Sequence, residues 1–490
     1  MDREKNQIQQ LLCTADRNAA VHGLNKVAAL NAASGTLPWS DMDNTDQAYL
    51  PTVGRWGCEW PRGSKSGYSG KCNHHDQCYC NNEVLLRNNF DLGENGIILN
   101  NNTIHNGIPF LKYDLLDELV EVTQVGGPWL NEHPLPLPTW APQPKKPLEI
   151  PTIWQYEQLA TQIELQVQKL LEEHNYNTVG NFLALYQGFK QSGCYSLKDF
   201  FHSYAPPITP LHHTCVGLAL ELWKRLIQLN DRFPGLTDYL YLVSCEENIE
   251  TVDNYALLGD RLDAVANSLE KEHVLLALRV EIAGRPGVLL CDPGYHIGRV
   301  ITVMFDQLYP HTGWFVQSRE SHAQKEYNYA FSTQNSKFVE WTEHNTNANG
   351  IQTRNTALIY IERPYLTAID VTERRNLVYN FRSLLSRDQK GHLKAGIYFK
   401  VKENHDEFTI FYQDGGVKKR LKYNLATFLY PERIEETTMK IIRECSNQLN
   451  LPEDALEGIL TSLAELFSDH SFVKQLLEIN QDINNMAEDN

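Results

Sequence analysis

The sequence predicts an α+β protein in which a helical body is followed by a β-rich body and then by further helices. Between residues 153 and 227, apolar side chains repeat at the three- and four-residue intervals of amphipathic helices. From residue 273 onward, runs of β-branched and aromatic residues are separated by Gly, Pro, Asn and Asp, as in antiparallel sheets. Helical periodicity returns from about residue 432.

The individual elements follow from the same periodicities. The first helix is expected over residues 153–175, with a buried stripe of Trp154, Leu159, Ile163, Val167, Leu170 and Leu171. Two more helices are expected at 181–191 and 197–204. Strands are expected at 273–282, 287–295, 356–362, 396–402 and 407–416, and C-terminal helices at 441–449, 455–467 and 472–480.

A proline-rich stretch at residues 134–151, PLPLPTWAPQPKKPLEIP, is the clearest boundary in the chain. Proline lacks a backbone donor and favours extended polyproline geometry, so we expect a linker here and not a packed element. The region before it, residues 1–133, is rich in Asn, Gly and short polar runs and is expected to consist mostly of loops.

Composition restricts the classes of function. The chain has 490 residues, 42% of them hydrophobic, which is enough for several cores. A formal net charge of -17 argues against a nucleic-acid partner, because phosphate recognition needs a concentrated basic surface. The charged start MDREKNQIQQ does not resemble a signal peptide, and no run is long enough to span a membrane. We therefore expect a cytoplasmic protein with mostly reduced cysteines and no membrane association.

Cys215 lies directly before a helical stripe in ITPLHHTCVGLALELWKRLIQLN. At a helix start, unpaired backbone amides and the helix dipole stabilise a thiolate, which is the nucleophilic form of cysteine. The start itself is ambiguous, because Thr209 followed by Pro210 competes with Thr214 as the N-cap. The neighbouring His212 and His213 are expected to line a pocket. Four other cysteines are expected to be core thiols: Cys194, Cys245, Cys291 and Cys445.

A predicted hairpin supplies the partners that a nucleophilic cysteine needs. His273 opens the strand HVLLALRVEI, and Asp292 ends the returning strand GVLLCD. A base activates the thiol and a carboxylate fixes the tautomer of that base, so Cys215, His273 and Asp292 are the candidate catalytic residues. Direct opposition of His273 and Asp292 requires a turn centred near residue 282 or 283, or else a bulge.

The order of these residues resembles the arylamine N-acetyltransferases, which belong with the transglutaminase-like cysteine enzymes. The similar segments are HVLLALRVEIAGRPGVLLCDPGY, YNYAFSTQNSKFVEW and FRSLLSRDQKGHLKAGIYFKV, and the resemblance covers about residues 150–430. It implies a helical domain (152–260), an antiparallel β-barrel (261–365) and a mixed α/β third domain (366–430). The N-terminal region and the C-terminal helices (431–490) lie outside the resemblance. It also implies acyl transfer from a coenzyme A thioester to an amine or hydroxyl acceptor, with Cys215 carrying the acyl group.

The resemblance leaves other functions open. The family approaches its cysteine through Arg-Gly-Gly, whereas this chain has LHHTCVGL, so the donor and the acceptor are not defined. The same three residues could attack an amide, as in a cysteine peptidase, an amidase or a transglutaminase-like enzyme. Alternatively, the fold could serve as a catalytically inactive interaction module whose terminal extensions bind protein partners. Taken singly, each residue also has a purely structural role.

A cluster of cysteines and histidines lies in the N-terminal region, in WGCEWPRGSKSGYSGKCNHHDQCYCNNE. The residue types suit zinc, but the spacing differs from the usual paired knuckles, and an ordinary loop with free thiols is the alternative. The fragment CNHHDQCY, residues 72–79, also resembles the active-site helix of secreted phospholipases A2, which would make His75 the base and Asp76 a calcium ligand. The zinc candidates are Cys58, Cys72, His75, Cys78 and Cys80.

Overall fold

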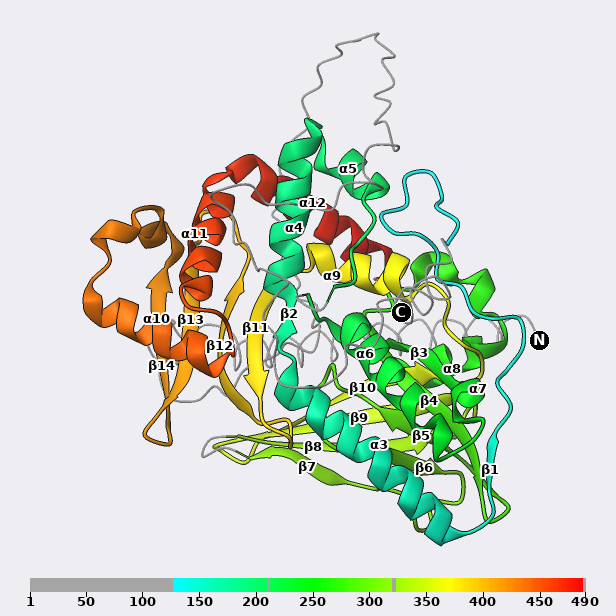
Figure 1. The fold of residues 1–490 in the computed structure, drawn as a ribbon. Helices are drawn as coiled ribbons and strands as arrows, with labels where there is room; N and C mark the ends of the chain where they lie inside the picture. Colours follow the sequence, from blue (N-terminus) through cyan, green and yellow to red (C-terminus); the bar gives the residue numbers. More distant parts are fainter. Residues whose placement is uncertain (1–126, 210–211, 320–322, 488–490) are drawn as a thin grey trace, which may run out of the picture.

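Helices and antiparallel sheets are combined in the computed structural model, which describes residues 127–209, 212–319 and 323–487 (Figure 1). The predicted mixture of helices and antiparallel strands is confirmed. A π-helix at Ala368–Glu373 runs directly into α9 (Arg374–Val378). The other α-helices are α3 (Ile153–Glu173), α4 (Thr178–Ser192), α5 (Leu197–Ser203), α6 (Cys215–Ile227), α7 (Leu236–Tyr239), α8 (Val252–Leu257), α10 (Glu436–Gln448), α11 (Ala455–Ser468) and α12 (His470–Met486).

A nine-stranded sheet forms the larger body. Its strands are β1 (Leu148–Ile150), β3 (Leu240–Glu246), β4 (His273–Ile282), β5 (Arg285–Cys291), β6 (Ile301–Met304), β7 (Phe315–Arg319), β8 (Ala323–Phe331), β9 (Phe338–Asn347) and β10 (Gln352–Tyr360). The order is β6-β5-β4-β3-β10-β9-β8-β7, with β1 added in parallel to β4. The sheet curls (Figure 1), but its edge strands β6 and β7 do not pair with each other in the part of the chain that the structure describes. The larger sheet is therefore open and curled, whereas a closed barrel was predicted.

A smaller sheet of five strands completes the framework. Its order is β14-β13-β12-β11-β2, for β14 (Val417–Asn424), β13 (Glu407–Asp414), β12 (Leu393–Lys400), β11 (Phe381–Arg387) and β2 (Tyr176–Asn177). All its pairings are antiparallel. The two-residue strand β2 lies between α3 and α4, so it ties the first helices of the chain to this late sheet.

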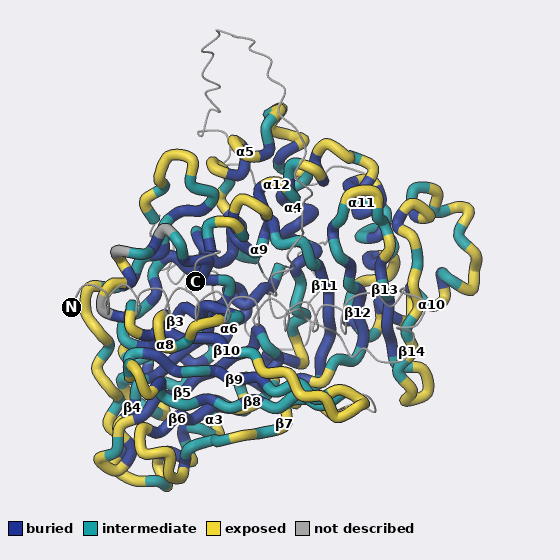
Figure 2. The backbone as a smooth tube through the Cα atoms, turned by 180° about the vertical axis from the view of Figure 1, so that it is seen from behind, coloured by how far each residue is buried: buried dark blue, intermediate teal, exposed yellow. Residues whose placement is uncertain are grey.

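Buried apolar side chains form three cores. Along the backbone, buried residues are concentrated in the strands and exposed residues in the outer loops (Figure 2). One lies between α3, α6 and one face of the larger sheet. A second fills the inside of the curl, with alternate residues of β3, β4, β5 and β9, as expected for strands whose side chains point to opposite faces. The third joins the smaller sheet to α4, α5 and the C-terminal helices.

The buried stripe of α3 differs from the prediction at its first turn. Trp154 is 64% exposed, and Tyr156 occupies the core position two residues later. The hydroxyl of Thr152 caps the helix by accepting a hydrogen bond from the Gln155 amide at 3.2 Å. The Tyr156 hydroxyl meets the Thr302 hydroxyl at 2.7 Å on β6, which gives this buried polar atom a partner.

The proline-rich stretch is packed against the body, in contrast to the expected free linker. Leu135 and Trp140 are buried, and the Trp140 indole donates to the Ser244 hydroxyl at 3.1 Å. The stretch ends in β1, where Ile150 pairs with Ile282 of β4. The apolar residues between the prolines gain enough burial to fix the segment, a contribution that a composition-based prediction overlooks.

Two further differences concern the predicted domain ranges. Residues 152–260, expected to be helical, contain the fully buried strand β3, which pairs with both β4 and β10. The C-terminal helices, expected as an addition, share a core with α4 and α5.

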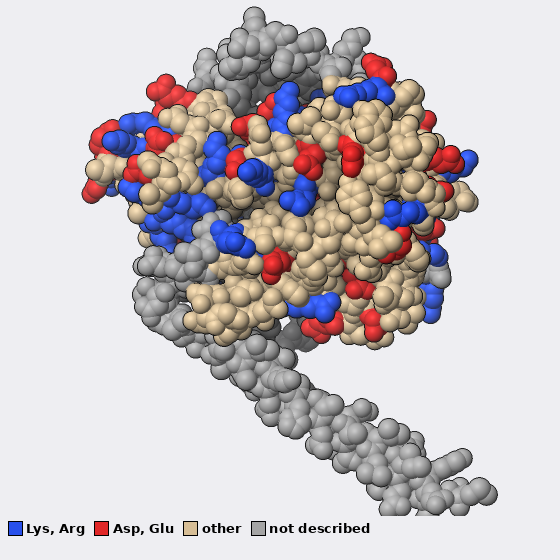
Figure 3. Space-filling view, turned by 90° about the horizontal axis from the view of Figure 1, so that it is seen from below, with Lys and Arg blue, Asp and Glu red and all other residues tan. Residues whose placement is uncertain are grey.

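Charged side chains of both signs are spread over the face shown in Figure 3. Exposed ion pairs contribute only about 0–1 kcal/mol each, so the buried cores provide most of the stability.

Candidate functional site

Cys215 is the first residue of α6, which decides between the two possible helix starts. Its N-cap is Thr214, whose side chain makes no capping hydrogen bond. The Thr214 hydroxyl instead donates to the buried carboxylate of Glu373. The thiol therefore sits at a helix N-terminus where the cap side chain does not satisfy the amides, a position that favours negative charge.

The β4–β5 hairpin brings His273 and Asp292 together without a bulge. Ala283 and Gly284 form the turn with φ of 49° and 76°, as in the tight turns that join twisted strands. The pairing then runs regularly from Ile282 opposite Arg285 to Leu276 opposite Cys291. The turn therefore lies slightly later in the chain than the position that would place His273 directly opposite Asp292. Asp292 follows the end of β5, and its two carboxylate oxygens lie 3.1 and 3.0 Å from His273 Nε2.

The imidazole of His273 lies between the carboxylate and the thiol. All three side chains are buried, with 3% of Cys215, 2% of His273 and none of Asp292 exposed. Burial lowers the pKa of His273, but the charge and hydrogen bond of Asp292 and a hydrogen bond to Cys215 outweigh it. The net effect raises the pKa of His273 well above its ordinary value, which favours the imidazolium form of the ring.

Gly294 allows the loop after Asp292 to approach the thiol. A Cβ at this position would lie 2.8 Å from the Cys215 Cβ and 2.8 Å from the His273 Cε1. Arg387 of β11 holds the same loop, because its guanidinium donates to the Pro293 carbonyl at 2.8 Å and contacts His296 Nδ1 at 2.7 Å. The smaller sheet therefore fixes the loop that carries the carboxylate.

The π-helix and α9 add two polar groups that the sequence did not predict. The Asn376 carboxamide donates toward the Cys215 sulfur at 3.7 Å and is oriented by a second hydrogen bond, to the Thr372 carbonyl at 3.0 Å. Burial raises the pKa of Glu373 to about 7, and its hydrogen bonds from Thr214 and Asn181 oppose that rise. No local sequence signal marks either residue, because α9 reaches the thiol only through tertiary folding.

A cavity of about 60 Å³ opens beside the thiol and the imidazole. A single bound water needs about 10–15 Å³ by the same measure, so the cavity has room for several waters, for a small acyl group or for the head of a larger molecule. Its lining includes carboxylates as well as aromatic and hydroxyl groups: Tyr176, Thr178, Cys215, Glu247, Glu272, His273, Gly294, Tyr295, Asn376, Tyr379, Phe381 and Ser383.

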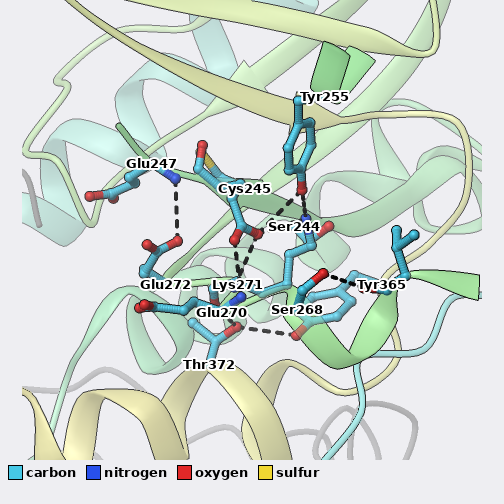
Figure 4. Close-up of polar contacts among 12 residues, drawn as sticks. Ser244, Cys245, Glu247, Tyr255, Ser268, Glu270, Lys271, Glu272, Tyr365 and Thr372 are labelled. Carbon is cyan, nitrogen blue, oxygen red and sulfur yellow. Dashed lines mark hydrogen bonds and ion pairs between the residues drawn. The ribbon is translucent and has the colours of Figure 1, made fainter. Parts of the chain in front are cut away.

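Buried ion pairs surround the segment that leads into β4 (Figure 4). The Lys271 ammonium lies 2.9 Å from a carboxylate oxygen of Glu246, which also accepts hydrogen bonds from the Glu270 amide and the Tyr255 hydroxyl. Arg375 of α9 pairs with Glu270 at 2.9 Å. These contacts fix the backbone immediately before His273.

Other residues singled out by the sequence lie elsewhere. His212 and His213 do not line the cavity, and burial lowers the pKa of His213 to about 3. The prediction that they line a pocket at this site is wrong. Cys245, Cys291 and Cys445 are buried, as predicted, whereas Cys194 is half-buried.

The N-terminal candidates Cys58, Cys72, His75, Cys78 and Cys80 and the phospholipase-like fragment lie outside the described residues. In the part of the chain that is described, no group of three or more His, Cys, Asp or Glu side chains is arranged to hold a metal ion. No helix in that same part is both long and apolar enough to cross a membrane.

Comparisons with known proteins found one distant likeness. No protein family matches the sequence, and neither does any curated protein. Among solved structures, the arylamine N-acetyltransferase from Mycobacterium abscessus is similar with probability 1.00, a TM-score of 0.35 and 10% sequence identity. The similarity covers 65% of this chain and 90% of that protein. It is a distant relationship at the level of the fold alone.

Proposed function

We propose that this chain is a cysteine-dependent acyltransferase that moves an acyl group from a coenzyme A thioester to an amine or hydroxyl acceptor. One observation carries the proposal: a thiol at a helix N-terminus, an imidazole and a buried carboxylate meet beside one cavity. This is the arrangement that nucleophilic catalysis by cysteine requires. The size of the cavity supports a small acyl group.

In the first half-reaction, the Cys215 sulfur attacks the thioester carbonyl carbon. The oxyanion that forms is stabilised by the Cys215 backbone amide and by the Asn376 carboxamide, which is already directed at the sulfur. The bond to the coenzyme A sulfur then breaks, and the leaving thiolate takes the proton held by His273. The products are acyl-Cys215, free coenzyme A and a neutral imidazole.

In the second half-reaction, the acceptor attacks acyl-Cys215 and gives a proton to the neutral His273. The Cys215 thiolate leaves, and the ion pair of thiolate and imidazolium is restored. Asp292 holds the ring through Nε2, so the other nitrogen is directed toward the sulfur in both steps.

The proposal is tested by intact mass spectrometry after incubation with a series of short-chain acyl-CoA donors. We expect the protein to gain the mass of one acyl group, located on Cys215 by peptide mapping and absent from Cys215→Ser. Cys291→Ser, a buried cysteine that does not line the cavity, is the matched control and should still acylate. No mass gain with any donor, alongside an enzyme that does acylate, would contradict the proposal and favour an inactive interaction module.

A further inference from the structure

Two carboxylates line the cavity beside Cys215. Glu247 follows β3 and Glu272 precedes β4, and both line the cavity with Cys215 and His273. The two segments are neighbours because β3 pairs with β4 through Cys245 and His273. Two carboxylates therefore face the space in which an acceptor must approach the acyl group.

Glu272 differs from Glu246 and Glu270 in having no cationic side chain paired with it among the described residues. Glu246 pairs with Lys271 and Glu270 pairs with Arg375, so each has a buried cation beside it. Glu272 accepts a hydrogen bond from the Glu247 amide at 3.2 Å (Figure 4), but no Lys or Arg of residues 127–209, 212–319 and 323–487 forms an ion pair with it. A cation is therefore the group that the Glu272 carboxylate lacks among the described residues.

The electrostatics of Glu272 agree with its geometry. Desolvation, followed by the charges of Glu246, Glu270 and Glu247, raises the pKa of Glu272 well above its ordinary value. A cation placed against the carboxylate would reverse part of this effect, because opposite charge favours the ionised form. Glu247 is held in place by the Tyr295 hydroxyl at 2.5 Å, and the Tyr295 ring lies edge-on to the His273 ring.

We infer that the acceptor is a cationic aliphatic amine, and that Glu272 binds its ammonium group and removes a proton from it before acyl transfer. This inference rests on the proposed function. The ammonium gives one proton to Glu272, and the neutral amine nitrogen bonds to the carbonyl carbon of acyl-Cys215. The C–S bond breaks, the thiolate leaves, and the second proton passes from nitrogen to His273. The products are an amide, the thiolate–imidazolium pair and a protonated Glu272.

The test uses two acceptors of similar shape and different charge: benzylamine, which is an ammonium ion at neutral pH, and aniline, which is not. The full chain is first acylated, and the loss of acyl mass from Cys215 is then followed with each acceptor. We expect benzylamine to deacylate the protein faster than aniline. In Glu272→Gln the rate with benzylamine should fall by about tenfold or more, and the rate with aniline should change little.

Glu281→Gln is the matched control, because Glu281 lies on β4 and is exposed. A wild-type preference for aniline, or a Glu272→Gln variant that keeps the preference for benzylamine, would overturn the inference while leaving the proposed function intact. Failure of the first acylation would overturn both. If Glu272→Gln does not fold, the inference can still be tested with the wild-type chain. The KM for benzylamine should rise on acidification through the range in which Glu272 takes up its proton. A KM that does not depend on pH would contradict the inference.

Discussion

Asp292 is the residue on which the proposed activity of His273 depends most. Its carboxylate makes the two contacts to Nε2, and it is completely buried. We expect Asp292→Asn to slow acylation of Cys215 by about 10²–10⁴-fold, because the ring loses its orientation and its preferred tautomer. The rate is measured by quenched-flow mass spectrometry with a saturating donor. Asp306→Asn, at an exposed pair with Arg285, should keep the wild-type rate.

The raised pKa of Glu373 makes the free energy of unfolding depend on pH. Its pKa is raised from 4.5 to about 7, so the native state holds a proton that the unfolded state has already released. This group therefore lowers the stability as pH rises from about 4.5 to about 7, by about 3 kcal/mol in all. Glu373→Gln removes the charge, so at pH 8 we expect it to raise the free energy of unfolding relative to the wild type.

Urea unfolding at pH 5 and pH 8 measures this effect. The gain in Glu373→Gln should be close to zero at pH 5, where the wild-type carboxyl is largely protonated. Glu403→Gln, at an exposed position, should show no difference at either pH. An equal effect of Glu373→Gln at both pH values would show that the carboxyl stays ionised in the folded protein.

At the scale of single residues, the sequence predicts the proposed nucleophile, base and carboxylate, but not the groups around them. Cys215, His273 and Asp292 can be found because each lies at the end of a strongly periodic segment. Asn376 and Glu272 have no such signal. Their positions depend on how α9 and the two segments beside β3 and β4 pack together, and one sequence contains no information on those distances.

Among the elements, α9 and α12 connect the candidate site to the C-terminal helices. Arg375 donates to Glu270 before β4 and to Asn480 and Asn484 of α12, each at 2.9 Å. Its neighbour Asn376 reaches the Cys215 sulfur. One buried guanidinium thus ties the segment leading into His273 to the last helix of the described chain.

Arg375→Met is expected to lower the free energy of unfolding by about 3–5 kcal/mol, because it leaves the Glu270 carboxylate buried without its cation. The double variant Glu270→Gln with Arg375→Met should recover much of this loss, since no charge then remains unpaired. Chemical unfolding gives both values. As a control, Arg433→Met removes an exposed pair with Glu432 and should change stability by less than about 0.5 kcal/mol.

The predicted elements are most accurate where periodicity is strong and long. The helices over 153–175 and 455–467 and the hairpin strand at 273–282 are confirmed as α3, α11 and β4. The prediction missed β3, whose residues are buried on both faces and therefore show no alternation. The prediction also assigned the packed stretch at 134–151 as a linker, because it was based on the proline content and not on the apolar residues between the prolines.

For the whole molecule, the C-terminal helices are part of the fold and not an appendage. Leu460, Leu463 and Leu476 are completely buried in the core that also holds Phe182 of α4 and Ile397 of β12. A chain that ends before residue 431 would expose the apolar faces of both. We expect such a truncation to abolish cooperative thermal unfolding, as measured by circular dichroism and calorimetry. A truncated chain that unfolds cooperatively would show that these helices form a separate unit.

Activation of the Cys215 thiol by His273 and Asp292 can be measured by site-resolved alkylation. The full chain is treated with iodoacetamide from pH 5.5 to 8.5, and the modification of each cysteine is followed by peptide mapping. We predict that Cys215 reacts at least about tenfold faster than a free cysteine at pH 6, and that Asp292→Asn removes this advantage. If Cys215 alkylates no faster than an unperturbed thiol, at a rate that Asp292→Asn leaves unchanged, then His273 and Asp292 do not activate the thiol.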